Sequence, residues 1–111
     1  MSPRPRDPLA AVAPVFAALG DRTRLSLLSR LADGRPRSIV QLTQGTGLTR
    51  QGVSKHLAIL KEARLVRNER CGRESRYVLQ PDALMEARQY LERASQQWDD
   101  AVERLRRFVE E

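Results

Sequence analysis

Apolar residues recur at steps of three and four along the first third of the chain, which is the spacing of amphipathic helices. A first helix is predicted from residue 9 to Gly20. A second helix follows Asp21, a residue type that commonly caps helix N-termini, and stops at Asp33-Gly34. In the first helix the residues at helical spacing are Leu9, Val12, Phe16 and Leu19. In the second helix Leu25, Leu28 and Leu31 are expected to point inward.

Two further helices are predicted between Ser38 and residue 64. Ser38 is expected to cap a short helix, residues 45–48 to form a tight glycine-containing turn, and Thr49 to cap a helix over 49–64. The inward positions are Ile39 and Leu42 in the short helix and Val53, Leu57 and Leu60 in the longer one. A short helix, a glycine turn and a second amphipathic helix make a helix-turn-helix.

From Leu65 the period of the pattern changes to two, which indicates β-strands. Two strands within residues 66–79 are separated by a turn predicted over residues 70–74, so this segment is a β-hairpin. The cations of the hairpin are Arg67, Arg70, Arg73 and Arg76. The predicted fold is therefore mainly α (α+β), a winged helix-turn-helix with a two-stranded β-wing.

A long last helix is predicted from about Asp82 to Glu110, with apolar residues at alternating steps of three and four. Its stripe is Leu84, Ala87, Leu91, Ala94, Trp98, Ala101, Leu105 and Phe108. Because the earlier helices already supply a core, this stripe favours a dimerisation surface over packing within the same domain.

Charge is distributed unevenly along the chain. Residues 1–80 hold 15 Lys/Arg against 6 Asp/Glu, a net +9, whereas residues 81–111 hold 5 against 8, a net −3. A basic region of this kind suits a polyanionic partner, although a solvated basic surface is the alternative. Residues 1–8, rich in proline and arginine, are expected to be a disordered arm, with a single domain over 9–111.

The helix over 49–64 presents cations and hydrogen-bond donors opposite its apolar stripe, which suits the major groove of double-stranded DNA. Arg50 is expected to read guanine and Gln51 adenine, while Ser54 and Lys55 hold phosphate. The predicted DNA-binding residues are Thr49, Arg50, Gln51, Ser54, Lys55, His56, Arg70, Arg73 and Arg76. Three carry alternatives, because Thr49 is first a cap, His56 suits a packing role, and Arg76 is able to pair with glutamate across the hairpin.

Several classes of function are disfavoured by residue content. Cys71 and His56 are the only cysteine and histidine, so no thiol–imidazole metal site, intrachain disulfide or cofactor is predicted, and an enzyme lacks its usual groups. Cys71 is expected to be inert, with an intermolecular disulfide or oxidation as the alternative. The single cysteine suits a reducing cytoplasm, and no apolar run reaches the length of a membrane span.

Two segments together resemble a known family. Ala18-Leu19-Gly20-Asp21-Arg22-Thr23-Arg24 and Gly47-Leu48-Thr49-Arg50-Gln51-Gly52-Val53-Ser54-Lys55-His56-Leu57, followed by Gly72-Arg73 and Arg76-Tyr77, are similar to the ArsR/SmtB winged-helix repressors. The resemblance covers residues 9–110 and implies a homodimer that binds a palindromic operator and represses transcription.

The resemblance also implies a dimer interface built from the first and last helices. Its residues here are Leu9, Val12, Phe16, Leu84, Leu91, Ala94, Trp98, Ala101, Leu105 and Phe108.

This sequence lacks the residues with which many members of that family bind metal ions. Residues 39–43 contain no thiol and the last helix contains no histidine, so we expect no metal switch. A thiol- or small-molecule-responsive regulator and a winged-helix protein-interaction module are the alternatives. Eight Lys/Arg against three Asp/Glu in residues 50–76 favour DNA over a protein partner.

Overall fold

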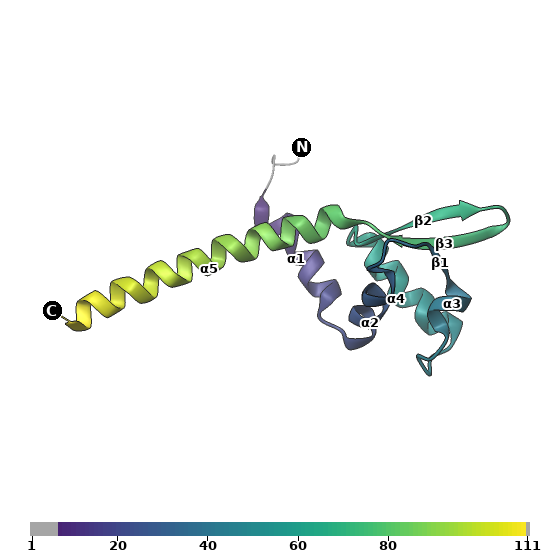
Figure 1. Ribbon diagram of the computed structural model, residues 1–111, viewed down its shortest axis with the longest axis horizontal. Helices are drawn as coiled ribbons and strands as arrows, with labels where there is room; N and C mark the ends of the chain where they lie inside the picture. The colour runs from purple at the N-terminus through teal and green to yellow at the C-terminus, as the bar shows by residue number, and fades with distance from the viewer. Residues whose placement is uncertain (1–6, 111) are drawn as a thin grey trace.

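The computed structural model describes residues 7–110 and is mainly helical, with one small antiparallel sheet (Figure 1). Its elements are α1 (Pro8–Leu19), α2 (Arg22–Leu31), β1 (Arg37–Ser38), α3 (Ile39–Thr43), α4 (Arg50–Glu62), β2 (Val66–Cys71), β3 (Glu74–Leu79) and α5 (Pro81–Glu110). The predicted winged helix-turn-helix with a long C-terminal helix is confirmed.

Three predicted helix caps are present, and each satisfies a backbone N–H that the first helical turn leaves without a partner. The Asp21 carboxylate accepts from the amide of Arg24 at 3.0 Å, and the Thr49 hydroxyl accepts from the amide of Gly52 at 3.0 Å. Ser38 forms a full capping box with Gln41. Short-range sequence signals therefore set where α2, α3 and α4 begin.

The core lies where α2, α3 and α4 meet, and the stripe of α4 is confirmed, with Val53, Leu57 and Leu60 fully buried. The prediction for α2 is wrong at one position, because Leu25 is 48% exposed and Leu27 is fully buried instead. Leu25 precedes Leu31 by six residues, about 240° of helix rotation, so the two cannot share one face. Leu27, Leu28 and Leu31 form the inward face.

The hairpin turns more tightly than the alternation indicates. Strands β2 and β3 pair down to Cys71 and Glu74, which leaves a turn of only Gly72 and Arg73 in place of the predicted turn over 70–74. Gly72 has φ +64°, a conformation that side chains disfavour. A third strand, β1, pairs with β3 at Arg37–Tyr77 and was not predicted, because two residues carry no alternation.

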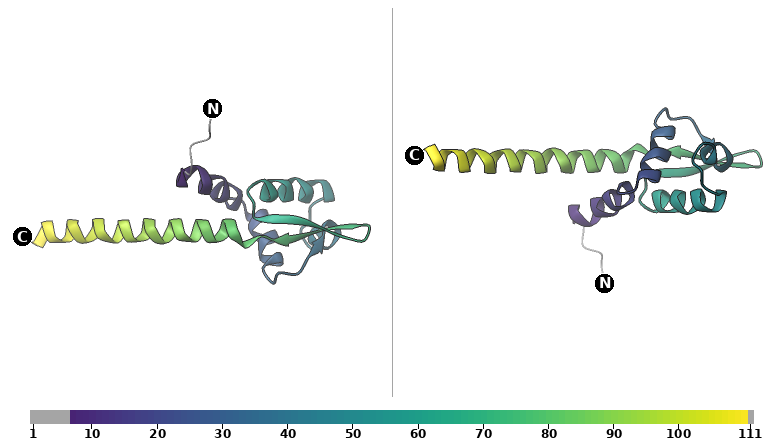
Figure 2. Two further views of the ribbon diagram at one scale, coloured as in Figure 1. Left: turned by 90° about the horizontal axis from the view of Figure 1, so that it is seen from above. Right: turned by 90° about the horizontal axis from the view of Figure 1, so that it is seen from below.

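Helix α5 packs on α1 only near its N-terminal end. Ala83 and Ala87 are buried there, and the rings of Phe16 and Tyr90 meet edge to face with centroids 5.9 Å apart. Beyond Tyr90 the helix extends away from the other elements in every view, and α1 and α4 lie on the same side of it (Figures 1 and 2). About two thirds of α5 therefore has no neighbour within the described part of the chain.

The structure describes only part of the predicted N-terminal arm, residues 1–8. Residues 1–6 of the predicted arm lie outside the described residues. Pro8, also assigned to the arm, is the first residue of α1, with Asp7 as its cap. Among residues 7–110, no helix is long and apolar enough to cross a membrane.

Candidate nucleic-acid interface

The outward face of α4 is the centre of the candidate interface. Arg50, Gln51 and Lys55 are exposed and Ser54 is half-buried, on the side opposite the buried stripe. Packing of that stripe against α2 and α3 keeps α4 from rotating about its own axis. These four polar side chains are thus brought together on one surface, as the sequence pattern indicates.

The turn that presents α4 is held by Arg30, which sequence reasoning missed. Its guanidinium Nη1 donates to the carbonyls of Leu42, at 3.0 Å, and Gln44, at 2.5 Å. Gly45 has φ +77°, and a Cβ there would stand 3.3 Å from Arg30 Nη2. The arginine thus satisfies carbonyls at the end of α3 and fixes the helix-turn-helix geometry.

The hairpin arginines divide into two kinds. Arg67 pairs with Glu69 at 2.8 Å and Arg76 with Glu74 at 3.1 Å, so both pairs run along a strand rather than across the hairpin. Within residues 7–110, Arg70 and Arg73 are exposed and form no ion pair. The cationic end of the wing is therefore made by these two side chains.

His56 is not on the outward face of α4, contrary to its assignment among the DNA-binding residues. Its Nδ1 lies 3.4 Å from Arg24 Nη1 and 3.8 Å from Asp21 Oδ2, and its side chain is only 24% exposed. It precedes the buried Leu57 by one residue and faces the junction of α1 and α2. Its packing alternative describes its position better.

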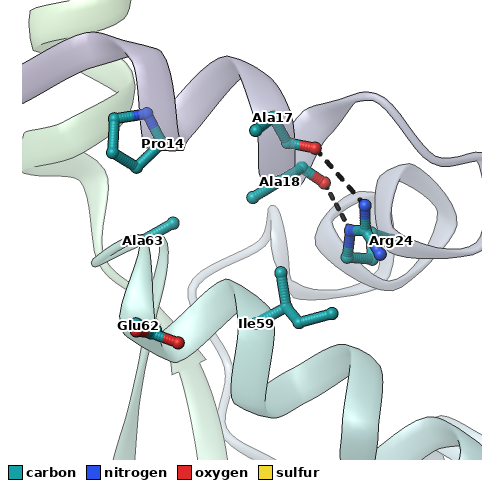
Figure 3. Close-up of a pocket in the computed structure, with 7 residues that line it drawn as sticks. All are labelled: Pro14, Ala17, Ala18, Arg24, Ile59, Glu62 and Ala63. Carbon is teal, nitrogen blue, oxygen red and sulfur yellow. Dashed lines mark hydrogen bonds between the residues drawn. The ribbon is translucent and has the colours of Figure 1, made fainter. Parts of the chain in front are cut away.

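Arg24 joins three helices at this junction. Its Nε donates to the carbonyl of Ala18 at 2.6 Å and its Nη2 to that of Ala17 at 3.3 Å, at the C-terminal end of α1 (Figure 3). The amide of Arg24 in turn donates to Asp21, and this bond is the main reason the pKa of that carboxyl lies below its usual value. The Gly20–Arg24 motif thus has a structural role, which sequence reasoning did not assign.

Beside Arg24, an open cleft of about 500 Å³ separates α1 from α4 (Figure 3). Pro14, Ala17, Ala18, Ile59 and Ala63 supply its apolar wall, and Arg24 and Glu62 its polar edge. The cleft adjoins α1, and residues 8–19 contain no polar side chain at all. A helix that is apolar all round is normally covered on all sides.

The residues predicted for a dimer interface fall into three groups by exposure. Leu9, Leu91, Trp98, Leu105 and Phe108 are exposed, at 58%, 51%, 71%, 64% and 79%. Ala94 and Ala101 are half-buried by their own helix. Phe16 and Leu84 pack partly on the core, and Val12 is only 5% exposed, so Val12 is a residue of the protomer interior and little of it is left for a partner.

Cys71 is exposed at the end of β2. Within residues 7–110, no three His, Cys, Asp or Glu side chains are arranged as metal ligands would be.

Comparisons with known proteins agree with this geometry. Residues 19–69 match a family model described as a helix-turn-helix domain. The HTH-type transcriptional regulator KmtR of Mycobacterium tuberculosis is 44% identical over 70 residues, 63% of this chain and 53% of KmtR. The chain thus spans about half the length of that relative.

Two solved structures are similar over most of the chain. An ArsR-like transcriptional regulator from Rhodococcus sp. RHA1 is 34% identical, with a TM-score of 0.78 over 89% of this chain and 92% of that one. The homodimeric winged helix-turn-helix DNA-binding domain Mb0332 from Mycobacterium bovis is 27% identical, with a TM-score of 0.64 over 86% and 91%.

Proposed function

Since this chain belongs to the ArsR family of winged helix-turn-helix transcriptional regulators, we propose that it binds a palindromic operator as a homodimer and represses transcription. The observation that carries the proposal is the pairing of two cationic surfaces. One is the outward face of α4, and the other is the wing end at Arg70 and Arg73. A groove-reading helix flanked by a basic wing is how winged helices hold a duplex.

Each side chain has a role that follows from its position and chemistry. Near the N-terminus of α4, Arg50 reads guanine and Gln51 reads adenine. Ser54 and Lys55 hold phosphates, and Thr49 first caps the helix. Exposed Arg70 and Arg73 reach the minor groove or its phosphates, whereas Arg76 contributes less because Glu74 already neutralises it.

The homodimer has two supports. The similar domain from M. bovis is described as homodimeric, and five large apolar side chains of α5 beyond Tyr90 are more than half exposed. Four of these five, Leu91, Trp98, Leu105 and Phe108, lie on one stripe, so a second copy is able to cover them together; Val109 stands beside the stripe. We also propose that no soft metal is sensed, since α3 has no thiol and α5 no histidine.

The test is binding to the DNA upstream of its own gene, measured by fluorescence anisotropy at several salt concentrations. The wild type is expected to lose affinity steeply as salt rises. Arg50→Ala should relax sequence preference by about 1–3 kcal/mol at one base pair. Arg73→Ala should weaken binding on all sequences and reduce the salt slope by about one.

Arg67→Ala is the matched control, because it removes a wing arginine that is already paired with Glu69. Its effect on the salt slope is expected to be smaller than that of Arg73→Ala. Wild-type binding that does not respond to salt would refute the proposed function. Equal losses from Arg50→Ala and Arg73→Ala on every sequence would refute the assigned roles.

A further inference from the structure

One glycine of the chain lies where the fold gains nothing from it. Gly52 is in the first turn of α4, and glycine lowers the stability of a helix relative to alanine. Gly20 differs, because it ends α1 as its C-cap. The other four glycines have a positive φ, a backbone conformation that other residues disfavour, and they are Gly34, Gly45, Gly47 and Gly72. Backbone conformation therefore does not explain a glycine at position 52.

The protein itself leaves room for a side chain at this position. A Cβ built on Gly52 would lie 3.4 Å from Thr49 Oγ1 and 3.8 Å from the Cβ of Leu48, which are ordinary van der Waals distances. Apart from the two adjacent residues and the backbone of α4, no other atom in the described part of the chain comes within 4 Å of it. The helices packed on α4 therefore do not require a glycine here.

Helix α3 shows that the same local geometry accepts a long side chain. Its cap, Ser38, has φ −76° and ψ 165°, nearly the angles of Thr49, which has φ −77° and ψ 161°. Three residues after Ser38, the Gln41 side chain accepts from the amide of Ser38 at 2.9 Å and completes the capping box. Gly52 holds the equivalent position after Thr49. A glutamine there would supply α4 with a second cap that glycine cannot form.

Gly52 lies on one flank of the candidate DNA-binding face. It stands between exposed Gln51 and buried Val53, each about 100° away around the helix axis. When a helix enters the major groove, its outward face meets base edges and its flanks face the sugar–phosphate backbones that border the groove. Lys55, assigned above to a phosphate, follows one turn later on the same side. The part of a duplex that faces Gly52 is therefore its backbone.

We propose that position 52 is kept free of a side chain so that the sugar–phosphate backbone of one DNA strand packs directly against the Cα of Gly52. The proposal rests on the DNA binding proposed above and adds a residue that sets how closely α4 approaches the duplex. A methyl group here holds the helix away from the groove and lengthens the contacts of Arg50 and Gln51. Affinity then falls on all sequences alike, because the backbone carries no sequence information.

Two substitutions test this proposal by separating stability from binding. Gly52→Ala should raise Tm by about 2–5 °C in thermal unfolding at one fixed protein concentration, because the native backbone accepts alanine and the unfolded chain loses freedom. Gly52→Gln should be at least as stable, through the capping box. Affinity for the DNA upstream of its own gene, measured by fluorescence anisotropy, should nevertheless fall about tenfold for Gly52→Ala and further for Gly52→Gln.

Gly20→Ala is the matched control. Gly20 has φ −77°, and a Cβ there would also lie 3.4 Å from its nearest neighbour, the carbonyl oxygen of Ala17. It ends α1, which is not part of the candidate interface. Its affinity for the same DNA should stay within about twofold of wild type. Copies of the DNA with single base-pair changes complete the design, and on each of them Gly52→Ala should lower affinity by the same factor.

Three results would overturn the inference while leaving the proposed function intact. The first is wild-type affinity in both variants of Gly52. The second is a Gly52→Ala protein less stable than wild type, because the glycine would then serve the fold. The third is a loss of affinity confined to particular base pairs. A wild type that does not bind the DNA at all would instead remove the proposed function itself, so the two failures are distinguishable.

Discussion

The junction made by Arg24 gives a sharp test of how this fold is held together. Arg24→Ala removes a guanidinium that donates to two carbonyls at the end of α1. The carbonyl of Ala17 also accepts from the amide of Gly20 at 3.3 Å, so it keeps a partner. The carbonyl of Ala18 belongs to a residue that is only 2% exposed, and it loses its 2.6 Å bond.

The expected cost follows from that one bond. A hydrogen bond to a charged group contributes about 1.5–3 kcal/mol, and the carbonyl left behind is costly to bury unpaired. The stem of Arg24 also lines the cleft between α1 and α4, so some packing is lost. We expect the free energy of unfolding to fall by about 2–3 kcal/mol, which lowers Tm by roughly 10 °C in a domain of this size.

The assay is thermal unfolding followed by circular dichroism, at one fixed protein concentration because a dimer's Tm depends on it. Arg22→Ala is the control, since Arg22 is exposed in the same helical turn, and its replacement should change stability by less than about 0.5 kcal/mol. Arg24→Lys keeps the charge without the forked donors and should be intermediate. If Arg24→Ala cost no more than Arg22→Ala, this account of the junction would be wrong.

Three further outcomes are expected. Thr49→Ala should destabilise by about 1 kcal/mol in urea unfolding while Thr49→Ser should not, and equal losses would mean that the cap is unimportant. Arg64 has φ +61°, a backbone conformation that glycine adopts more easily than other residues. Arg64→Gly should therefore be about 0.5 kcal/mol more stable than Glu86→Gln, which removes only the surface ion pair between Arg64 and Glu86. A Gly variant less stable than the Gln variant would contradict this. The pKa of Asp33 is lowered chiefly by its hydrogen bond from Arg37, and that of Asp21 by a backbone amide. Both native pKa values lie below the unfolded value of about 3.9, so the stabilisation from these carboxylates is full above that pH and is lost as pH falls below it. Asp33→Asn should flatten this fall in the free energy of unfolding at acid pH. An acid profile unchanged by Asp33→Asn would argue against a stabilising role for this carboxylate.

The features that were predictable depend on residues close together in the chain. The caps at Asp21, Ser38 and Thr49 act within three residues, and the stripe of α4 acts within two helical turns. Rotation about one helix axis and one hydrogen bond per cap are local quantities. The winged helix-turn-helix, the outward face of α4 and the heptad of α5 could therefore be derived from spacing alone.

The features that were missed depend on which distant elements meet. Arg24 and His56 are 32 residues apart, and no local pattern indicates that they touch. The error at Leu25 is of another kind, because rotation about the axis of α2 already separates Leu25 from Leu31. Arg76 was ambiguous because the sequence leaves open whether a glutamate on the same strand or the opposite one neutralises it.

Local spacing thus determined the elements other than β1, and the buried face of α4, because a helix or strand has a fixed geometry wherever it lies. The three-dimensional arrangement decided which polar groups remain available at those faces. Among the residues that the structure describes, Arg70 and Arg73 have no ion-pair partner, since Glu69 pairs with Arg67 and Glu74 with Arg76. His56 turns away from the outward face because Arg24 and Asp21 lie beside it. Electrostatic and hydrogen-bond partners are set by distance in space, and chain spacing does not encode that distance.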